Sequence, residues 1–323
     1  MALGTGHIIP ADVGDFIPEL WEDDVIAAYK ASLVMANRVR KMNHVGKKGD
    51  VIHIPKPTRG SASTKAVETQ VTLVNPAVSV VDISINKHRE YSVLIEDITD
   101  VQALSSMRRF YTDDAGYAIA RYVDFDLHVL GTGLQGGTLD ATPGTPAAQT
   151  LAYSAAKIGS NGSTTWSASA NTNTGNGAAL TDAGLRKMMQ TLDDVDTPMM
   201  DRTIIIPPVE KNTLLGIDRF TRWDAVGDAG KANSIRNGKI GDIYGVEVFI
   251  STACPTIAAA DTTTMYRVGM IFHKDAFVLI EQLGARAQSQ YKQEYLADLF
   301  TVDTIYGVGE RRDDAGVAFV VPV

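Results

Sequence analysis

Residues 46–65, with the sequence GKKGDVIHIPKPTRGSASTK, join a short apolar run to a polar stretch of small residues. The run Val51–Pro57 predicts a short strand, and the residues around Gly60 predict a turn or flexible tip. Val67–Val74 then predicts a strand that returns along the first one. This part of the chain is therefore expected to form an extended β-hairpin.

The same region carries an excess of positive charge. Between Val25 and Val67 the only acid is Asp50, so this segment has a net charge of about +8, whereas the whole chain has −8. Such an arm gains orientation and association rate when it lies on an acidic surface of a neighbouring subunit. From charge alone, a solvated basic face is the more common explanation. As contacts between subunits, we predict five of its basic residues: Lys47, Lys48, Lys56, Arg59 and Lys65.

Length, composition and termini limit the class of protein. The chain has 323 residues, enough for a large core and for two domains. A pI near 5.3 argues against a dedicated nucleic-acid-binding protein, and the single Cys254 excludes an intrachain disulfide. Because we find neither a secretory signal in Met1–Pro18 nor an apolar stretch of about 20 residues, we expect no membrane segment and assembly in the cytoplasm.

The first half of the chain predicts two helices around one long strand. Phe16–Met42 has helical spacing, and Val80–Ile95 alternates as a half-buried strand with a possible bulge near Arg89. Asp97–Phe110 is weakly helical, and Thr112–Leu130 is the strongest helix, capped by Thr112 or Asp113. Its apolar stripe includes Ile119, Tyr122 and Val123, while Asp124, Asp126 and His128 are assigned to the polar side.

The second half predicts shorter elements of both kinds. Residues 136–179 are rich in small polar residues and predict a surface insertion anchored by Trp166. A short linker in place of residues 141–176 should leave the subunit folded. Thr304–Gly309 and Val317–Val321 are expected to pair with each other. The class is α+β with an extended hairpin arm. The other predicted elements are a helix over Thr181–Asp194, a strand over Arg202–Ile206, a helix over Val209–Leu215, and strands over Val246–Ile250, Met265–Phe272 and Ala276–Ile280.

No pattern predicts a catalytic, cofactor or metal site. Residues 131–136 match G-x-G-x-x-G, but they follow a helix instead of opening one, so they predict a helix end and not a nucleotide site. The six histidines lack metal-ligand spacing, and Cys254 has no base nearby in the sequence. Paired acids such as Asp113 and Asp114 lie at helix starts or turns, where capping explains them.

The order of these elements resembles that of the major capsid (coat) proteins of tailed bacteriophages, which have the Hong Kong-type capsid fold, and particularly those of short-tailed phages. The most specific segment is 237–248, NGKIGDIYGVEV, which is similar to a turn that feeds a strand of the axial domain in this family. Val51–Pro55 resembles the base of the family's extended loop, 111–130 its spine helix, and 202–208 an axial strand that leads into a short helix.

This resemblance implies a domain plan for the chain. It comprises an N-terminal arm over residues 1–45, an extended loop over 46–76, a peripheral domain with the spine helix over 77–135, an insertion over 136–180, an axial domain over 181–290, and returning peripheral strands over 291–323.

The resemblance also implies a function without catalysis. The expected role is a structural subunit that assembles as pentamers and hexamers into an icosahedral shell around double-stranded phage DNA, without sequence-specific binding, inside the bacterial host cytoplasm. Its expected partners are other copies of itself, a separate scaffold protein and the portal. Two alternatives stay open, namely a cytoplasmic α+β enzyme that uses Cys254 or an Asp pair, and another phage-assembly component.

Overall fold

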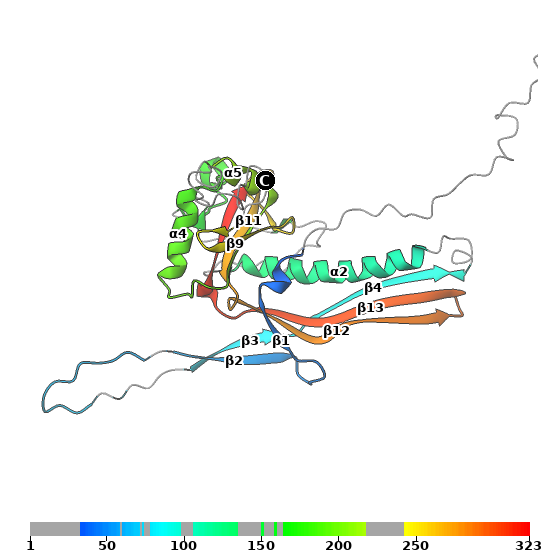
Figure 1. Cartoon of the computed structure of the whole chain (residues 1–323), viewed down its shortest axis with the longest axis horizontal. Coiled ribbons are helices and arrows are strands. Elements are labelled where there is room, and N and C mark those ends of the chain that lie inside the picture. Colours follow the sequence, from blue (N-terminus) through cyan, green and yellow to red (C-terminus); the bar gives the residue numbers. More distant parts are fainter. Residues whose placement is uncertain are drawn as a thin grey trace, which may run out of the picture.

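The computed structural model describes residues 33–58, 60–71, 73, 78–97, 106–134, 150–151, 158–159, 164–217 and 242–323. They form two sheets, a projecting hairpin and a long helix that runs along one of the sheets (Figure 1). Helices and strands both contribute to the core, which confirms the α+β class.

One sheet is long and carries a helix on one face. It has the order β1-β12-β13-β4 and consists of β1 (Arg40–Asn43), β12 (Phe277–Lys292), β13 (Ala297–Glu310) and β4 (Lys87–Glu96). The helix is α2 (Ser106–Gly131), which packs Ala115 and Ile119 against Val302 of β13. The predicted helix is thus confirmed, but it begins before Thr112 and Asp113, so neither residue is its cap.

The hairpin lies against the other face of this sheet. It consists of β2 (Val51–Pro57) and β3 (Val78–Ser84), which pair in antiparallel register from Val51–Ser84 to Pro57–Val78. Two glycines of β13 let β3 approach closely, because a Cβ at Gly307 would lie 2.6 Å from the Ser84 carbonyl oxygen and one at Gly309 would lie 2.6 Å from the Ile83 side chain. This contact fixes where the hairpin leaves the body.

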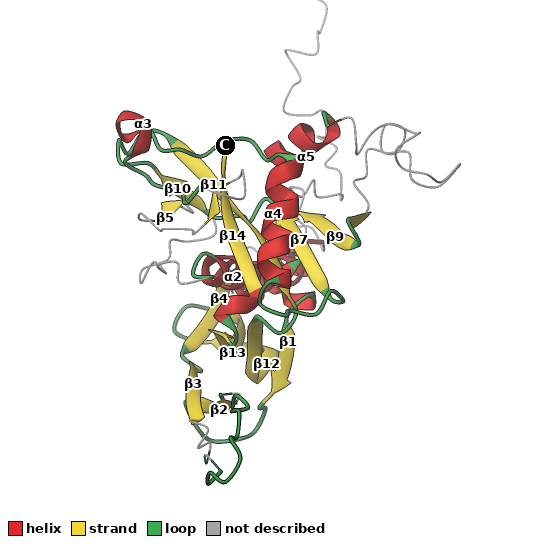
Figure 2. Ribbon diagram, turned by 90° about the vertical axis from the view of Figure 1, so that its left-hand side faces the viewer, coloured by secondary structure: helices red, strands yellow, loops and turns green. Residues whose placement is uncertain are grey.

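The second sheet forms the other part of the molecule (Figure 2). Its path is β5-β10-β11-β7-β9-β8, and β14 pairs with both β11 and β6. The strands are β5 (Thr150–Leu151), β6 (Ile158–Gly159), β7 (Arg202–Ile206), β8 (Asp242–Ile243), β9 (Val246–Ile250), β10 (Thr256–Ala258), β11 (Met265–His273) and β14 (Gly316–Pro322).

Among the described residues, three helices belong to this second part, and they are α3 (Ala170–Asn173), α4 (Asp182–Asp193) and α5 (Pro208–Leu215). The side chain of Thr181 caps α4 by accepting the Gly184 N–H over 3.1 Å. Leu185 and Met188 of α4 pack into the same cluster as Ile204 of β7. The predicted cap and buried stripe of α4 are confirmed, as are β2, β7 and β9.

The long strand predicted over Val80–Ile95 is wrong, because β3 and β4 are separate strands in different sheets. Ile85 and Asn86 belong to neither strand. Before them β3 lies on the face of the long sheet, and after them β4 pairs at the edge of that sheet. Pairing of β4 with β13 runs without a shift from Lys87 to Glu96, so the bulge near Arg89 is also wrong.

Two further predictions around the hairpin are wrong. The return strand is β3, so residues 67–71 and Leu73 are not in any strand. Within 33–42, the predicted helix is replaced by the 3₁₀ turn Met35–Asn37 and β1, because β1 pairs in parallel with β12. Residues 16–32 and 98–105, which we predicted to be helical, lie outside the described residues.

Three connections join the two sheets, from β4 through α2 to β5, from β11 to β12 and from β13 to β14, and the last two meet at one junction. At this junction the Ala276 carbonyl accepts the N–H groups of Arg311 at 2.8 Å and Arg312 at 3.2 Å. The predicted pairing of Thr304–Gly309 with Val317–Val321 is therefore wrong, since β13 stays with β12 while β14 joins β11. The boundary expected between 290 and 291 also fails to separate the sheets, because β12 crosses it.

The predicted insertion is partly integrated into the second sheet. Trp166 is 1% exposed, and its ring meets that of Tyr266 edge-on at 6.2 Å. The backbone N–H of Ala260 also donates to the Ala168 carbonyl over 3.1 Å. The predicted anchor at Trp166 is confirmed, because Trp166 and Ala168 are buried in the core, and replacing residues 141–176 by a linker would remove both.

Candidate assembly surfaces

The hairpin is the largest projection from the described chain (Figure 1). At its base, Ile52 and Ile83 pack in one cluster with Ile280 of β12. Beyond Pro57 and Val78 the two limbs are not paired as strands in the described residues. Their side chains are strongly exposed, with Val67 at 89% and Leu73 at 90%. Since large exposed apolar patches mark interaction sites, this limb is a candidate contact surface.

The predicted basic contacts are spread along this projection. Lys47 and Lys48 lie in the connection between β1 and β2, Lys56 lies in β2, and Lys65 lies on the outer limb. All four side chains are exposed, whereas Arg59 lies outside the described residues. The structure therefore places them on one projecting element, but it does not gather them into one compact patch.

Lys56 interacts electrostatically with Asp314 of its own chain. The pKa of Asp314 lies below its ordinary value, chiefly because Arg312 donates hydrogen bonds of 2.9 and 3.1 Å to its carboxylate, and Lys56 adds a smaller electrostatic contribution. A groove of about 470 Å³ separates β2 from this turn and is lined by Ile54, Lys56 and Arg312 among others. The base of the hairpin is thus electrostatically coupled to the junction between the sheets.

A buried carboxylate attaches the start of the described chain to α2. Asp124 Oδ1 accepts the backbone N–H of Val34 at 3.1 Å and that of Met35 at 2.7 Å. Asp124 and His128 are both fully buried, and His128 Nδ1 donates to the Asp124 carbonyl oxygen over 2.7 Å. Asp124 therefore holds Val34 and Met35 against α2.

A second buried carboxylate holds α2 on the long sheet. Asp126 is 3% exposed and accepts the hydroxyl of Tyr306 at 2.6 Å, while Lys87 Nζ lies 3.2 Å from its Oδ1 and Arg89 lies 3.5 Å from its Oδ2. Burial, and then the negative charge of Asp126, raise the pKa of Tyr306. The Arg89 guanidinium also lies 4.7 Å above the ring of Tyr122, which is half-buried.

The polar face assigned to α2 is therefore wrong at Asp124, Asp126 and His128. The signal that would have revealed them is the apolar neighbourhood: Phe125, Leu127 and Val129 alternate with these polar residues, so apolar side chains lie on opposite sides of the last turns of the helix. A helix of that kind is buried on every side.

The face of the long sheet opposite α2 carries a further ion pair. Arg286 of β12 donates two hydrogen bonds to Asp303 of β13, at 2.8 and 3.0 Å, and His88 of β4 lies 3.4 Å from the same carboxylate. These bonds from Arg286 keep the pKa of Asp303 below its ordinary value. The three residues link three adjacent strands.

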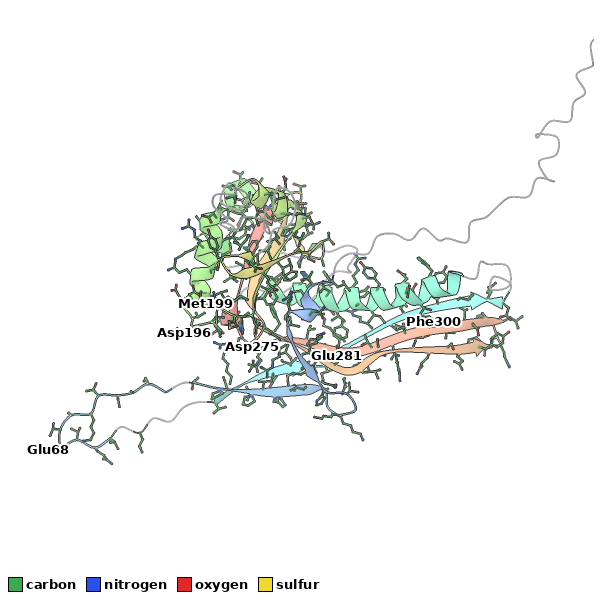
Figure 3. The ribbon with its side chains drawn as sticks, viewed as in Figure 1. Glu68, Asp196, Met199, Asp275, Glu281 and Phe300 are labelled. Atoms are coloured by element: carbon green, nitrogen blue, oxygen red, sulfur yellow. The ribbon has the colours of Figure 1, made fainter. Side chains whose placement is uncertain are left out.

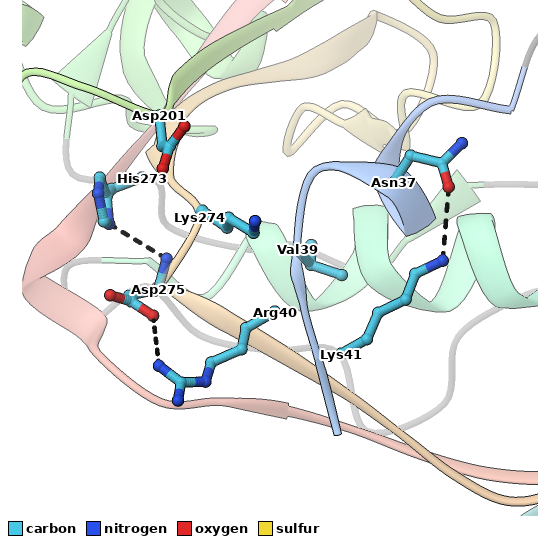
Figure 4. A pocket seen from close by; sticks show the side chains of 8 residues that line it. All are labelled: Asn37, Val39, Arg40, Lys41, Asp201, His273, Lys274 and Asp275. Carbon is cyan, nitrogen blue, oxygen red and sulfur yellow. Dashed lines mark hydrogen bonds and ion pairs between the residues drawn. The ribbon is translucent and has the colours of Figure 1, made fainter. Parts of the chain in front are cut away.

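A polar cavity of about 660 Å³ lies beside β1 and the turn between β11 and β12 (Figure 4). Arg40 and Arg311 both contact Asp275 Oδ1, at 3.1 and 3.0 Å. The Asp275 N–H donates to His273 Nδ1, and burial lowers the pKa of this histidine. Arg40 and Arg311 thus form ion pairs with Asp275, and we interpret the cavity as part of the structural contact between β1 and this turn.

The described residues do not support the nucleophile considered for Cys254. The thiol is fully buried, and burial raises its pKa to about 12. Among the residues that the structure describes, no group of His, Cys, Asp and Glu is arranged to hold a metal ion. α2 ends at Gly131 with turns over 132–134, which confirms the helix end predicted there. In the described parts of the chain, no helix is long and apolar enough to cross a bilayer.

Comparison with solved structures identifies this architecture. A structure from Mycobacterium phage Che8 is 22% identical and matches with a TM-score of 0.69, covering 94% of this chain and 97% of that chain. The capsid of cyanophage P-SCSP1u is 17% identical at 0.69, covering 96% and 94%. The capsid of Ralstonia phage GP4 is 12% identical at 0.67, covering 99% and 98%.

Sequence comparison adds no closer relative, since no family model and no curated protein matches the chain. The structural matches nevertheless extend over nearly its whole length. Together with the long helix on a long sheet, the projecting hairpin and the second sheet, they show that the chain has the fold of bacteriophage capsid proteins.

Proposed function

We propose that this chain is the major capsid protein of a tailed bacteriophage, a structural subunit that assembles with copies of itself into the virion shell. The observation that carries this proposal is the projecting hairpin. It exposes Val67, Val71 and Leu73 on limbs that are not paired as strands in the described chain. Such a surface is costly for a solitary protein and useful for one that assembles.

The finer points of the proposal follow from the fold and the charge. The shell is icosahedral and built from pentamers and hexamers, and it encloses double-stranded DNA without reading its sequence. A net charge of −8 supports this, because an acidic wall does not retain DNA. Assembly takes place in the host cytoplasm with a separate scaffold protein and a portal.

The basic residues have a role within this proposal. We infer that five basic residues from the sequence range 46–76 meet acidic groups of an adjacent subunit, namely Lys47, Lys48, Lys56, Arg59 and Lys65. The four described ones are exposed, which such a contact requires.

Expression of the chain with negative-stain microscopy and size-exclusion chromatography tests the proposal. A shell subunit gives pentamers, hexamers or shell-sized particles, at least when a scaffold protein is co-expressed. An enzyme gives a small closed oligomer or a monomer at every concentration. The latter result, under both conditions, would refute the proposed function.

A further inference from the structure

The turn between β11 and β12 contains a hydrogen bond that depends on the charge of a histidine (Figure 4). The backbone N–H of Asp275 donates to His273 Nδ1 over 3.1 Å. A backbone N–H only donates, so Nδ1 has to present a lone pair. His273 is therefore neutral here, with its proton on Nε2. A protonated ring carries a hydrogen on both nitrogens and cannot accept this bond.

The same turn joins distant segments of the chain. Asp275 Oδ1 contacts Arg40 of β1 at 3.1 Å and Arg311 of the β13–β14 connection at 3.0 Å. The Ala276 N–H donates to the His273 carbonyl over 2.8 Å, and the Ala276 carbonyl accepts the N–H of Arg311 over 2.8 Å. Asp275 lies where the two parts of the molecule meet (Figure 3). A change in this turn therefore reaches both β1 and the junction between the sheets.

β1 has few other contacts of this kind. It is an edge strand in the described part of the long sheet, and it pairs with β12 over four residues, Arg40–Asn43. The side chains of Arg40 and Asp275 are 50% and 39% exposed, so their ion pair is partly solvated and contributes little on its own. A small rearrangement of the turn is therefore sufficient to break it.

Burial keeps His273 neutral at ordinary pH. The residue is 8% exposed, and burial lowers its pKa below the ordinary value. Nearby charges oppose one another, since two acids raise this pKa and two bases lower it. The acids are Asp275 and Asp201, and the bases are Arg202 of β7 and Arg312 of the β13–β14 connection. Three further cations line the cavity beside His273, namely Arg40, Lys41 and Lys274.

We propose that His273 is an acid-sensitive switch for the contact of β1 with the junction between the sheets. The neutral ring holds the Asp275 N–H and keeps the Asp275 carboxylate between Arg40 and Arg311. A protonated ring directs an N–H at this N–H, so it turns away, attracted by the carboxylates of Asp201 and Asp275. The turn then opens and β1 loosens. The proposal concerns a single subunit and does not depend on assembly into a shell.

A second titrating group at the junction acts in the opposite direction. Burial, reinforced by Asp313, raises the pKa of Glu310 to about 7, so protonation of Glu310 stabilises the fold as pH falls. Glu310→Gln removes this contribution. The pKa values of Asp275 and Asp314 are lowered, so both acids stay ionised at mildly acidic pH. Acid loosening of the junction in Glu310→Gln is therefore the effect expected of a histidine.

Hydrogen–deuterium exchange followed by mass spectrometry tests the switch at pH 4.5, 5.5, 6.5 and 7.5, after correction for the intrinsic pH dependence of exchange. The chain is measured with and without Glu310→Gln, and circular dichroism checks that it is folded at each pH. As pH falls, we expect exchange in β1 and in residues 273–276 and 310–312 to become about three- to tenfold faster relative to α4, the internal reference.

Variants at one position separate the switch from a merely structural role. His273→Asn places an amide oxygen near the position of Nδ1, where it accepts the Asp275 N–H at every pH, so it is expected to keep the protection and lose the acid response. His273→Ala has no acceptor, so fast exchange is expected at every pH. His53→Asn, at an exposed position of β2, is the matched control and should respond as the wild type does.

Two results refute the switch. One is a natural chain whose junction shows no acid response relative to α4, with or without Glu310→Gln. The other is a response of His273→Asn as strong as that of the wild type. If His273→Asn is unfolded at pH 7.5, His273→Gln takes its place, because its amide oxygen also accepts hydrogen bonds. Failure of the chain to form particles refutes the proposed function alone and leaves this test unchanged.

Discussion

Met35 donates its backbone N–H to Asp124 Oδ1 over 2.7 Å, although the two residues are 89 positions apart. Val34 donates to the same oxygen, and Asp124 is 0% exposed. One carboxylate therefore holds Val34 and Met35 on the long helix.

Asp124→Ala is expected to destabilise this attachment strongly. It leaves two buried N–H groups without an acceptor, at a cost of about 1–3 kcal/mol each. Chemical denaturation measures the loss, and limited proteolysis is expected to cut faster near residue 33. Asp194→Asn, an exposed change at the end of α4, is the control and should stay within about 0.5 kcal/mol of wild type. Equal stability of the two variants would show that Asp124 is not an anchor.

Glu310 predicts a dependence of stability on pH. Burial, reinforced by Asp313, raises the pKa of Glu310 from 4.5 to about 7. The folded state therefore binds more protons than the unfolded state between these values, so the free energy of unfolding falls as pH rises from about 4.5 to about 7. We expect a fall of about 1–2 kcal/mol, because the group is partly solvated.

Glu310→Gln should reduce this slope, whereas Glu281→Gln, at an exposed position, should leave it unchanged. The raised pKa of the buried Glu210 adds to the slope, and the lowered pKa of His273 opposes it. Urea unfolding at pH 5, 6, 7 and 8 provides the measurement. The lowered pKa values of Asp275, Asp303 and Asp314 act in the opposite direction and only at more acidic pH. A slope in Glu310→Gln as steep as that of the wild type would show that Glu310 does not contribute to it.

Trp166→Ala is expected to cost about 3–5 kcal/mol, because it removes a buried aromatic side chain from the core. The ring contact with Tyr266 is lost at the same time. A shift of the urea midpoint reports the effect, with Thr165→Ala, at an exposed neighbouring position, as control. A change no larger than that of the control would mean that this segment is not part of the core.

Charge reversal on the hairpin tests the basic contacts. We expect Lys56→Glu combined with Arg59→Glu to reduce particle yield while the circular dichroism of the subunit stays unchanged. Because Lys56 also acts on Asp314, Lys65→Glu on the outer limb separates a contact between copies from this internal effect. Wild-type particle yield for both variants would contradict the proposed contact.

Local sequence patterns correctly predicted the helices and strands whose caps, turns and apolar residues lie within or next to the element itself. α4 has its cap at Thr181 and its stripe at Leu185 and Met188, and β9 is a short apolar run after the turn at Gly245. The break between β3 and β4 was not predictable in this way. The alternation continues through Ile85, and the break depends on the close approach of Gly307 and Gly309, more than 200 positions away.

The candidate contact surfaces were also predictable only in part. The charge of the hairpin can be counted in the sequence, but its exposed apolar limb becomes evident only when β3 begins at Val78. The buried acids of α2 were missed because their partners are remote: Tyr306 is 180 positions from Asp126. Helical periodicity carries no information about such partners.

The bond between the two crossings has a mechanical consequence. Arg311 and Arg312 both donate to the Ala276 carbonyl, so the β11–β12 and β13–β14 connections are held together there. The buried cluster that contains Phe125 of α2 also includes Met270 of β11 and Leu279 of β12. Tilting one sheet against the other would therefore require these hydrogen bonds and the buried packing between the sheets to change together.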